Sequence, residues 1–219
     1  MKGSLFLSAY YGDIAIFLIT AIVMVWQKQN TGQIKMVRAN GVSLAVIPII
    51  YAIQTKQISM IFLAVVILVV RAGITPSLIA RAFSQDNSTI QIKRSVNSTA
   101  ALLAAGVSVL VGYLIANSTV ALDPTAVVSA LPVPFGVILI SVILLVTARH
   151  MSNVLVAFLL LDNGISAVGF VLTRGIPPIV ELGALIDIAF LVFVLALLAG
   201  KLRIHIDDMD IDKLRELHE

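Results

Sequence analysis

Two aspartates stand inside long apolar stretches of the sequence, where an ionised side chain is expensive. Asp162 is eleven positions into the apolar segment 152–173, and Asp187 is about eight positions from the start of segment 179–200. At ~1.5 Å per helical residue, both carboxyls lie about 12–16 Å inside a ~30 Å hydrocarbon core. Placing a charged group there costs roughly 2.5–3.5 kcal/mol on insertion scales. Such residues therefore mark either a helix end or a function.

The two aspartates have the residue type and depth that proton transfer needs. A desolvated carboxyl can hold and release a proton, and the two are on segments joined by a short loop. Asn163 and Gly164 follow Asp162 and form a polar notch in the segment. Glu181, nearer the outer interface, is a third candidate for proton transfer, or it complements a helix dipole. The alternative is that the carboxyls are protonated and bind neighbouring helices structurally.

Arg71 is the basic counterpart of these acids, about thirteen residues into segment 58–80. An arginine stays charged at essentially any pH, so it cannot carry a proton by releasing one. We therefore expect it to be a fixed charge partner for a buried carboxylate. The alternative is that it snorkels to the inner face past a kink at Pro76.

Asp13 is the remaining acid within an apolar segment, and it follows Tyr10 and Tyr11. Tyrosines gather at membrane interfaces. We therefore place Asp13 at the headgroup level and expect a structural role for it.

The composition identifies a membrane protein. Of 219 residues, 59% are hydrophobic and 12% are charged, with a mean hydropathy of +1.05. Soluble domains are about a quarter charged, so a soluble enzyme, a disordered chain and a nucleic-acid binder are excluded. The net charge of +3 and the pI of about 9.3 are attributed to positive cytoplasmic loops.

The predicted fold is all-α, a transmembrane bundle of about seven helices. The second segment is short for a span and contains Pro48, so it must extend into flanking residues or kink. Only four residues join it to the third, so a merged or re-entrant pair is the alternative there. The first segment is too long for a signal-peptide core and is predicted to be a retained helix. The segments are 5–26, 41–54, 58–80, 97–117, 126–147, 152–173 and 179–200.

Basic residues predict the orientation. With the N-terminus outside and the C-terminus inside, the outer segments hold Lys2, Lys56 and Arg174. The inner connections and the tail then hold Lys28, Lys35, Arg38, Arg81, Lys93, Arg94, Arg149, Lys201, Arg203, Lys213 and Arg215. We expect the chain to be a multi-pass protein of the cell inner (cytoplasmic) membrane.

An internal echo suggests a parallel repeat. Residues 40–43 read Asn-Gly-Val-Ser and residues 163–166 read Asn-Gly-Ile-Ser, in the second and sixth segments. Segments 1–3 and 5–7 are then two copies, with chance similarity as the alternative. The predicted units are an N-terminal three-helix unit at 1–82, a linking loop with the fourth helix at 83–122, a three-helix unit at 123–200 and a cytoplasmic tail at 201–219.

The tail has the pattern of a short amphipathic helix that docks on a partner, with Asp210 at its start and Leu214 and Leu217 on one face. A solvated tail is the alternative. The chain has no cysteine, so it holds no thiolate metal site or iron–sulfur cluster. Its three histidines have no metal-ligand spacing, and we expect neither a cofactor nor a metal in this chain.

Several of these residues together resemble component E of hydrogenase-4, a membrane subunit of complex-I-related, group 4 nickel–iron hydrogenases. Segments 5–7 are also similar to the K subunit of complex I and to the C subunit of Mrp-type antiporters. The resemblance lies in Asp162-Asn163-Gly164, Val180-Glu181, Asp187-Ile188-Ala189-Phe190, the tail Asp210-Ile211-Asp212 with Leu214 and Leu217, and Arg71 with Pro76.

The resemblance implies specific roles. The third-helix acid of the K subunit aligns with Asp187, and its second-helix acid falls at Leu159, one turn before Asp162 and on the same face. The family's glutamate before Asn-Gly is Asp162 here, which keeps a titratable carboxyl. Its mid-segment lysine is Arg71, which removes a possible proton carrier.

The resemblance also implies the function and the partners. The chain is expected to be a non-catalytic membrane-arm subunit of a formate-hydrogenlyase-type complex that helps to move protons or Na⁺. Its partners would be antiporter-like subunits, a quinone-site-type membrane subunit and soluble hydrogenase subunits that carry the nickel–iron centre and the clusters. The alternatives are a non-conducting scaffold in a complex-I-like or Mrp-type assembly and a stand-alone seven-helix transporter.

Overall fold

The computed structural model describes residues 2–27, 29–82, 98–122, 125 and 127–173, and within them the chain is helical throughout its apolar segments. Six helical segments there are long and apolar enough to cross a membrane. The predicted all-helical membrane bundle is confirmed at that level. The predicted seventh helix, with Glu181, Asp187 and the docking residues of the tail, lies outside the described residues.

The six spans are built from nine helical elements, because two spans are interrupted by a change of helix type. The third span passes from α-helix to π-helix and back, and the fifth begins with a 3₁₀ turn. The elements are α1 (Lys2–Trp26), α2 (Asn30–Thr55), α3 (Ile58–Ile67), the π-helix η1 (Leu68–Ile74), α4 (Thr75–Ala82), α5 (Ser98–Leu122), the 3₁₀ helix η2 (Val128–Ala130), α6 (Pro132–Thr147) and α7 (Met151–Thr173).

The second span is longer than the apolar segment 41–54, mainly because the helix begins earlier in the sequence. Helix α2 begins at Asn30 and continues through Pro48 to Thr55, so it has a full membrane length. The expected extension into flanking residues is confirmed, because Lys35 and Arg38, which the orientation analysis placed in an inner connection, lie in the first turns of the helix. Arg38 Nη2 there donates to Ser77 Oγ of α4 at 3.0 Å.

The merged or re-entrant alternative for the second and third segments is also wrong, because α2 and α3 are separate helices that pack against each other. Lys56 makes the turn between them in the left-handed conformation (φ 58°), and its N–H donates to the carbonyl of Ala52 at 2.8 Å. This bond satisfies one of the last carbonyls of α2.

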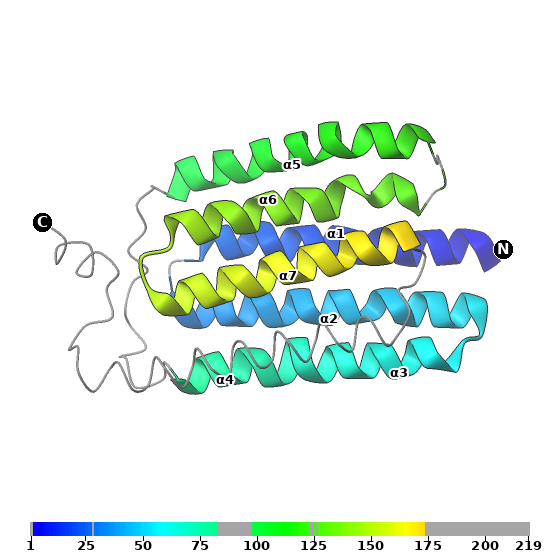
Figure 1. Ribbon diagram of the computed structural model, residues 1–219, viewed down its shortest axis with the longest axis horizontal. Coiled ribbons are helices and arrows are strands. Elements are labelled where there is room, and N and C mark those ends of the chain that lie inside the picture. The colour runs from blue at the N-terminus through cyan, green and yellow to red at the C-terminus, as the bar shows by residue number, and fades with distance from the viewer. Residues whose placement is uncertain (1, 28, 83–97, 123–124, 126, 174–219) are drawn as a thin grey trace, which may run out of the picture.

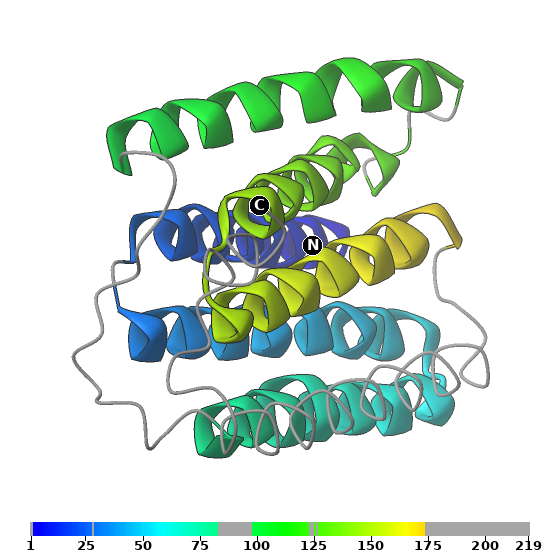
Figure 2. The same ribbon diagram turned by 60° about the vertical axis from the view of Figure 1, so that its left-hand side comes forward.

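Four helices form the centre of the bundle, and the others flank it (Figures 1 and 2). The hairpins α1–α2 and α6–α7 pack together through α1 with α6 and α2 with α7. The span of α3, η1 and α4 covers α2 on one side, and α5 covers α6 on the other. Each element of this centre therefore has neighbours on at least two sides.

Large apolar side chains fill the centre and also cover the outside. Phe17, Leu44 and Ile140 are fully buried between the helices. Phe62 and Leu110, on the flanking spans, expose more than half of their surface. Apolar residues on both faces of a helix are expected where lipid replaces water as the solvent, so the flanking helices α3 and α5 present a lipid-facing surface.

Helix α5 approaches α6 at two glycines. A Cβ atom placed on Gly112 would lie 2.6 Å from the backbone nitrogen of Gly136 and 2.9 Å from the carbonyl oxygen of Pro132. The same atom on Gly106, also in α5, would have no neighbour within 4 Å in the described part of the chain. Small residues permit such close packing between membrane helices, so Gly112 sets the distance between α5 and α6.

Gly112 and Gly106, both in α5, form a matched pair for a test of packing. Gly112→Ala should destabilise the protein by about 1–3 kcal/mol, because α5 and α6 must move apart. Gly106→Ala should be neutral or up to about 1 kcal/mol stabilising, since alanine is the better helix former. Reversible unfolding in mixed micelles measures both, and equal effects would contradict the proposed contact.

Candidate functional site

The most distinctive feature inside the bundle is an ion pair between Arg71 of η1 and Asp162 of α7. A guanidinium nitrogen of Arg71 contacts a carboxylate oxygen of Asp162, and the two side chains expose 4% and 13% of their surface. Arg71 lies near the middle of the span 58–81, and Asp162 lies near the middle of 151–173. Two opposite charges therefore meet at mid-depth in a bundle of membrane length.

The same guanidinium joins further residues of α7. Arg71 Nη1 donates to Asn163 Oδ1 at 2.9 Å, and Nη2 donates to Ser166 Oγ at 2.8 Å. An arginine has several donors in a rigid planar fork and no acceptor. One side chain thereby fixes three positions of α7, at Asp162, Asn163 and Ser166.

Hydrogen bonds continue from Asn163 across α2 to α1. Asn163 Nδ2 donates to Asn40 Oδ1 at 2.9 Å. Asn40 Nδ2 donates in turn to Thr20 Oγ1 at 2.9 Å and to the carbonyl of Phe17 at 3.0 Å. Because the guanidinium can only donate, Asn163 must present its oxygen to it, and both amide orientations follow. The amide N–H donors of Asn163 and Asn40 therefore both point away from Arg71, toward α2 and α1.

The local backbone brings Arg71 to this position. Residues 68–74 are wound as a π-helix, and the N–H of Thr75 donates to the carbonyl of Val70, five residues earlier. Pro76, next in the chain, has no N–H for the carbonyl of Ala72, so a regular α-helical pattern could not continue unbroken. A π-helical turn widens the helix and is frequent at functional sites.

Gly41 allows the π-helix to approach α2. A Cβ atom on Gly41 would lie 3.0 Å from the carbonyl oxygen of Arg71. Gly164 has the same role on the other side of the site, where an added Cβ atom would lie 2.8 Å from the side chain of Ile138 and 3.2 Å from its backbone nitrogen. Each Asn-Gly pair thus combines an amide that hydrogen-bonds with a glycine that lets a neighbouring helix close in.

A second buried carboxyl lies near this network. Asp13 exposes 7% of its surface and accepts a 2.8 Å hydrogen bond at Oδ1 from Ser43 Oγ. Its Oδ2 has no hydrogen-bond partner within the described part of the chain. Ser43 is three residues after Asn40 on α2, so this contact is about one turn along the helix from the asparagine pair.

The expectation that Asp13 sits at the headgroup level was wrong. Asp13 is near the middle of α1 and faces α2. The neighbouring tyrosines misled the interpretation, because Tyr10 is itself fully buried and packs on Tyr51 of α2. Asp13 is nine positions into the segment 5–26, a depth that already indicates a site inside the membrane. The same criterion of depth identified Asp187 as a candidate.

The structure thus brings together Arg71, Asp162, Asn163 and Gly164 from the predicted site residues. It adds Asn40, Ser166 and Asp13, which sequence reasoning did not assign to the site. The predicted proton-transfer residues Asp187 and Glu181, and the docking residues Asp210, Leu214 and Leu217, lie outside the described residues. Within the described ranges there is no group of three or more metal-ligating side chains.

Comparison with known proteins gives one informative match. The chain is 34% identical over 203 residues to the uncharacterized protein Rv0085 of Mycobacterium tuberculosis, and the match covers 92% of each chain. The chain belongs to the Rv0085 family. No family model matches the sequence, and no solved structure matches it. The match reaches across nearly the whole length of both sequences, so the similarity is not confined to single helices.

The ion pair predicts a non-additive effect on stability. Arg71→Met or Asp162→Leu alone should destabilise the fold by about 3–5 kcal/mol, because each leaves its partner charged, buried and unpaired. The double variant should cost clearly less than the sum, since it buries no charge.

A double-mutant cycle by reversible unfolding in mixed micelles measures the coupling. Additive losses would mean that the two side chains do not interact in the folded protein.

Proposed function

We propose that this chain is a membrane-arm subunit of a complex-I-related, membrane-bound nickel–iron hydrogenase of the formate-hydrogenlyase type. It would contribute buried charged groups to proton or Na⁺ translocation, driven by redox chemistry in partner subunits. The observation that supports this proposal is the Arg71–Asp162 pair at mid-depth, with a hydrogen-bonded network that reaches four spans.

Stability alone is a weak reason for such a pair. Well-packed apolar residues of similar volume are often as stabilising as a buried ion pair, or more so. A charge inside a membrane is costly, and intramembrane ionisable groups usually belong to ion pathways or relays. The retention of both charges in the middle of the bundle therefore favours a functional role.

The residues of the network divide into two groups by chemistry. Asn40 and Asn163 carry amides, which do not titrate, so they orient the site and do not carry protons. Asp162 and Asp13 carry carboxyls, which do titrate, and they are the acidic residues of the described spans. We assign proton exchange to the carboxyls and a constant positive charge to Arg71.

Redox cofactors would belong to the partners. The chain has no cysteine with which to hold an iron–sulfur cluster or a nickel–iron centre. This division predicts that the catalytic chemistry of the complex and ion movement can be separated by mutation in this chain.

Asp162→Asn, Asp13→Asn and Asp187→Asn should each reduce ion translocation severalfold and leave hydrogen oxidation with a soluble acceptor unchanged. The reason is that asparagine keeps the volume but cannot take up a proton. The measurements are the pH or Na⁺ gradient in inverted membrane vesicles and hydrogenase activity in the same vesicles. Asp123→Asn, between the spans α5 and α6 in the sequence, is the control.

Normal ion movement in all three variants would favour the alternative of a non-conducting scaffold, whose variants change assembly or nothing. A pull-down from native membranes, with mass spectrometry and metal analysis, tests the assignment to a hydrogenase. Copurification with a nickel-containing large subunit is the expected result. Recovery of the chain alone would contradict it and would favour a stand-alone transporter.

A further inference from the structure

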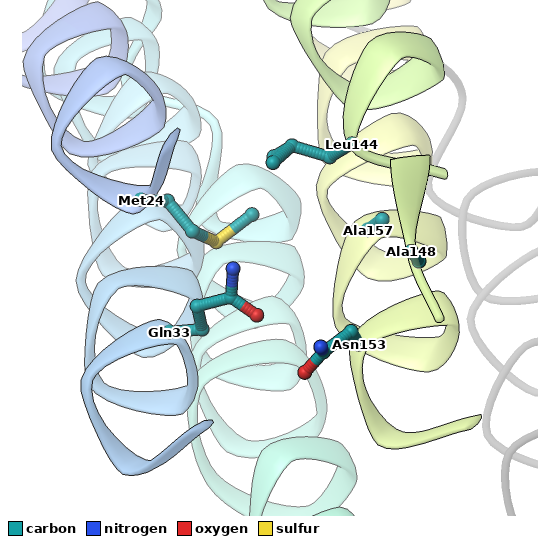
Figure 3. A pocket seen from close by; sticks show the side chains of 6 residues that line it. All are labelled: Met24, Gln33, Leu144, Ala148, Asn153 and Ala157. Carbon is teal, nitrogen blue, oxygen red and sulfur yellow. The ribbon is translucent and has the colours of Figure 1, made fainter. Parts of the chain in front are cut away.

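A small pocket lies where the two central hairpins meet, at the end of the bundle where α1 joins α2 and α6 joins α7 (Figure 3). It draws residues from both hairpins, and all but Ala148 are buried. The lining residues are Met24, Gln33, Leu144, Ala148, Asn153 and Ala157. The pocket has room for about one water molecule.

Asn153 gives the pocket its chemical character. The residue exposes 5% of its surface, and neither Oδ1 nor Nδ2 has a hydrogen-bond partner among the described residues. A buried amide without partners costs about 1–3 kcal/mol for each unsatisfied group. Figure 3 shows the Asn153 amide directed into the pocket toward the amide of Gln33, which is 3% exposed.

We propose that this pocket is a water-binding site, in which one ordered water molecule bridges Asn153 of α7 and Gln33 of α2. A water molecule needs two to four polar partners, and two amides with donors and acceptors supply them. The bridge satisfies Asn153 and joins the α1–α2 hairpin to the α6–α7 hairpin through a polar contact.

The walls select against other occupants. Among the described residues no charged side chain lines the pocket, so none of them compensates an ion there. Met24, Leu144, Ala148 and Ala157 are apolar, and the space is too small for a lipid chain or an organic ligand. A neutral molecule of the size of water that both donates and accepts fits this combination.

The position of the pocket also relates it to the charged site. Gln33 is seven residues before Asn40 on α2, which is two helical turns or about 10 Å. Under the proposed function, which this step rests on, the water lies between the Arg71–Asp162 pair and the end of the bundle where α1 joins α2. The buried apolar side chains of Val37, Val156 and Leu160 separate the two levels.

Met24 is a built-in probe of this water. Brief X-ray irradiation splits bound water into hydroxyl radicals, which add to the sulfur of an adjacent methionine. Dissolved oxygen then removes one electron from the adduct, and loss of its hydroxyl proton leaves the sulfoxide. Met24 is 1% exposed and Met60 of α3 is 8% exposed. Solvent access alone would therefore make Met60 the faster of the two, whereas a water in the pocket makes Met24 severalfold faster.

The experiment uses the full-length protein in nanodiscs, in ¹⁸O-labelled water, with oxidation of each methionine followed by mass spectrometry. Faster oxidation of Met24 than of Met60, with ¹⁸O incorporated, is the expected result. Asn153→Leu, which keeps the volume and removes the amide, should reduce Met24 oxidation to the Met60 level. Ser152→Ala, at the buried neighbouring position, should leave it unchanged.

Met24 oxidised no faster than Met60 in the unmodified protein would show that the pocket is dry and would overturn the proposal. A fast Met24 that Asn153→Leu does not slow would also overturn it, since the amide would then hold no water. The first of these outcomes is measured in the unmodified protein, so the proposal can be tested even if the Asn153→Leu variant does not fold. The readout is hydration, so it is independent of ion translocation and of the proposed function.

Discussion

The structure depends on the need to balance the charge of Arg71 in the middle of the membrane. A guanidinium cannot lose its proton there, so the bundle must supply a carboxylate and acceptors at that depth. Helix α7 supplies them from one face, with Asp162, Asn163 and Ser166 all on the same guanidinium. The relative height of α7 and the third span is thereby fixed by directional bonds, where apolar packing alone would permit sliding. The π-helical turn and Gly41 bring the backbone of Arg71 close enough for this to happen.

The two Asn-Gly pairs show how a small sequence element organises four helices. In a membrane, the attraction between helices comes from close packing and from interhelical hydrogen bonds, because lipid is as apolar as leucine. Asn40 and Asn163 provide the hydrogen bond between α2 and α7. The adjacent glycines admit η1 on one side and α6 on the other. The asparagine pair and the two close glycine contacts thus lie at the same depth in the bundle as the ion pair.

Much of this could be predicted from the sequence, and the remainder depends on three-dimensional contacts. Hydropathy and length predict the spans, and the cost of a buried charge singles out Arg71 and Asp162. The sequence does not show which acid faces Arg71, because six helices allow many pairings and the depths of Asp162 and Asp187 are similar. The likeness of residues 40–43 and 163–166 was interpreted as a repeat, whereas the structure shows in addition that their asparagines bind each other. Asp13 was misplaced because its tyrosine neighbours were assigned to the interface, although Tyr10 is fully buried inside the bundle.

The charge balance at the site has a consequence for any ion movement through it. Arg71 and Asp162 neutralise each other, so a proton added to Asp162 alone would leave an uncompensated guanidinium at mid-depth. That state costs several kcal/mol, unless a negative charge or a dipole is supplied from elsewhere at the same time. Asp13 has a serine hydroxyl as its hydrogen-bond partner and no salt bridge within the described residues, so a proton exchanged there breaks no ion pair. Protonation of Asp162 is therefore tied to the arrival of another charge, and the proposed ion translocation would require such a link. A subunit with a single isolated carboxyl would exchange protons without that coupling.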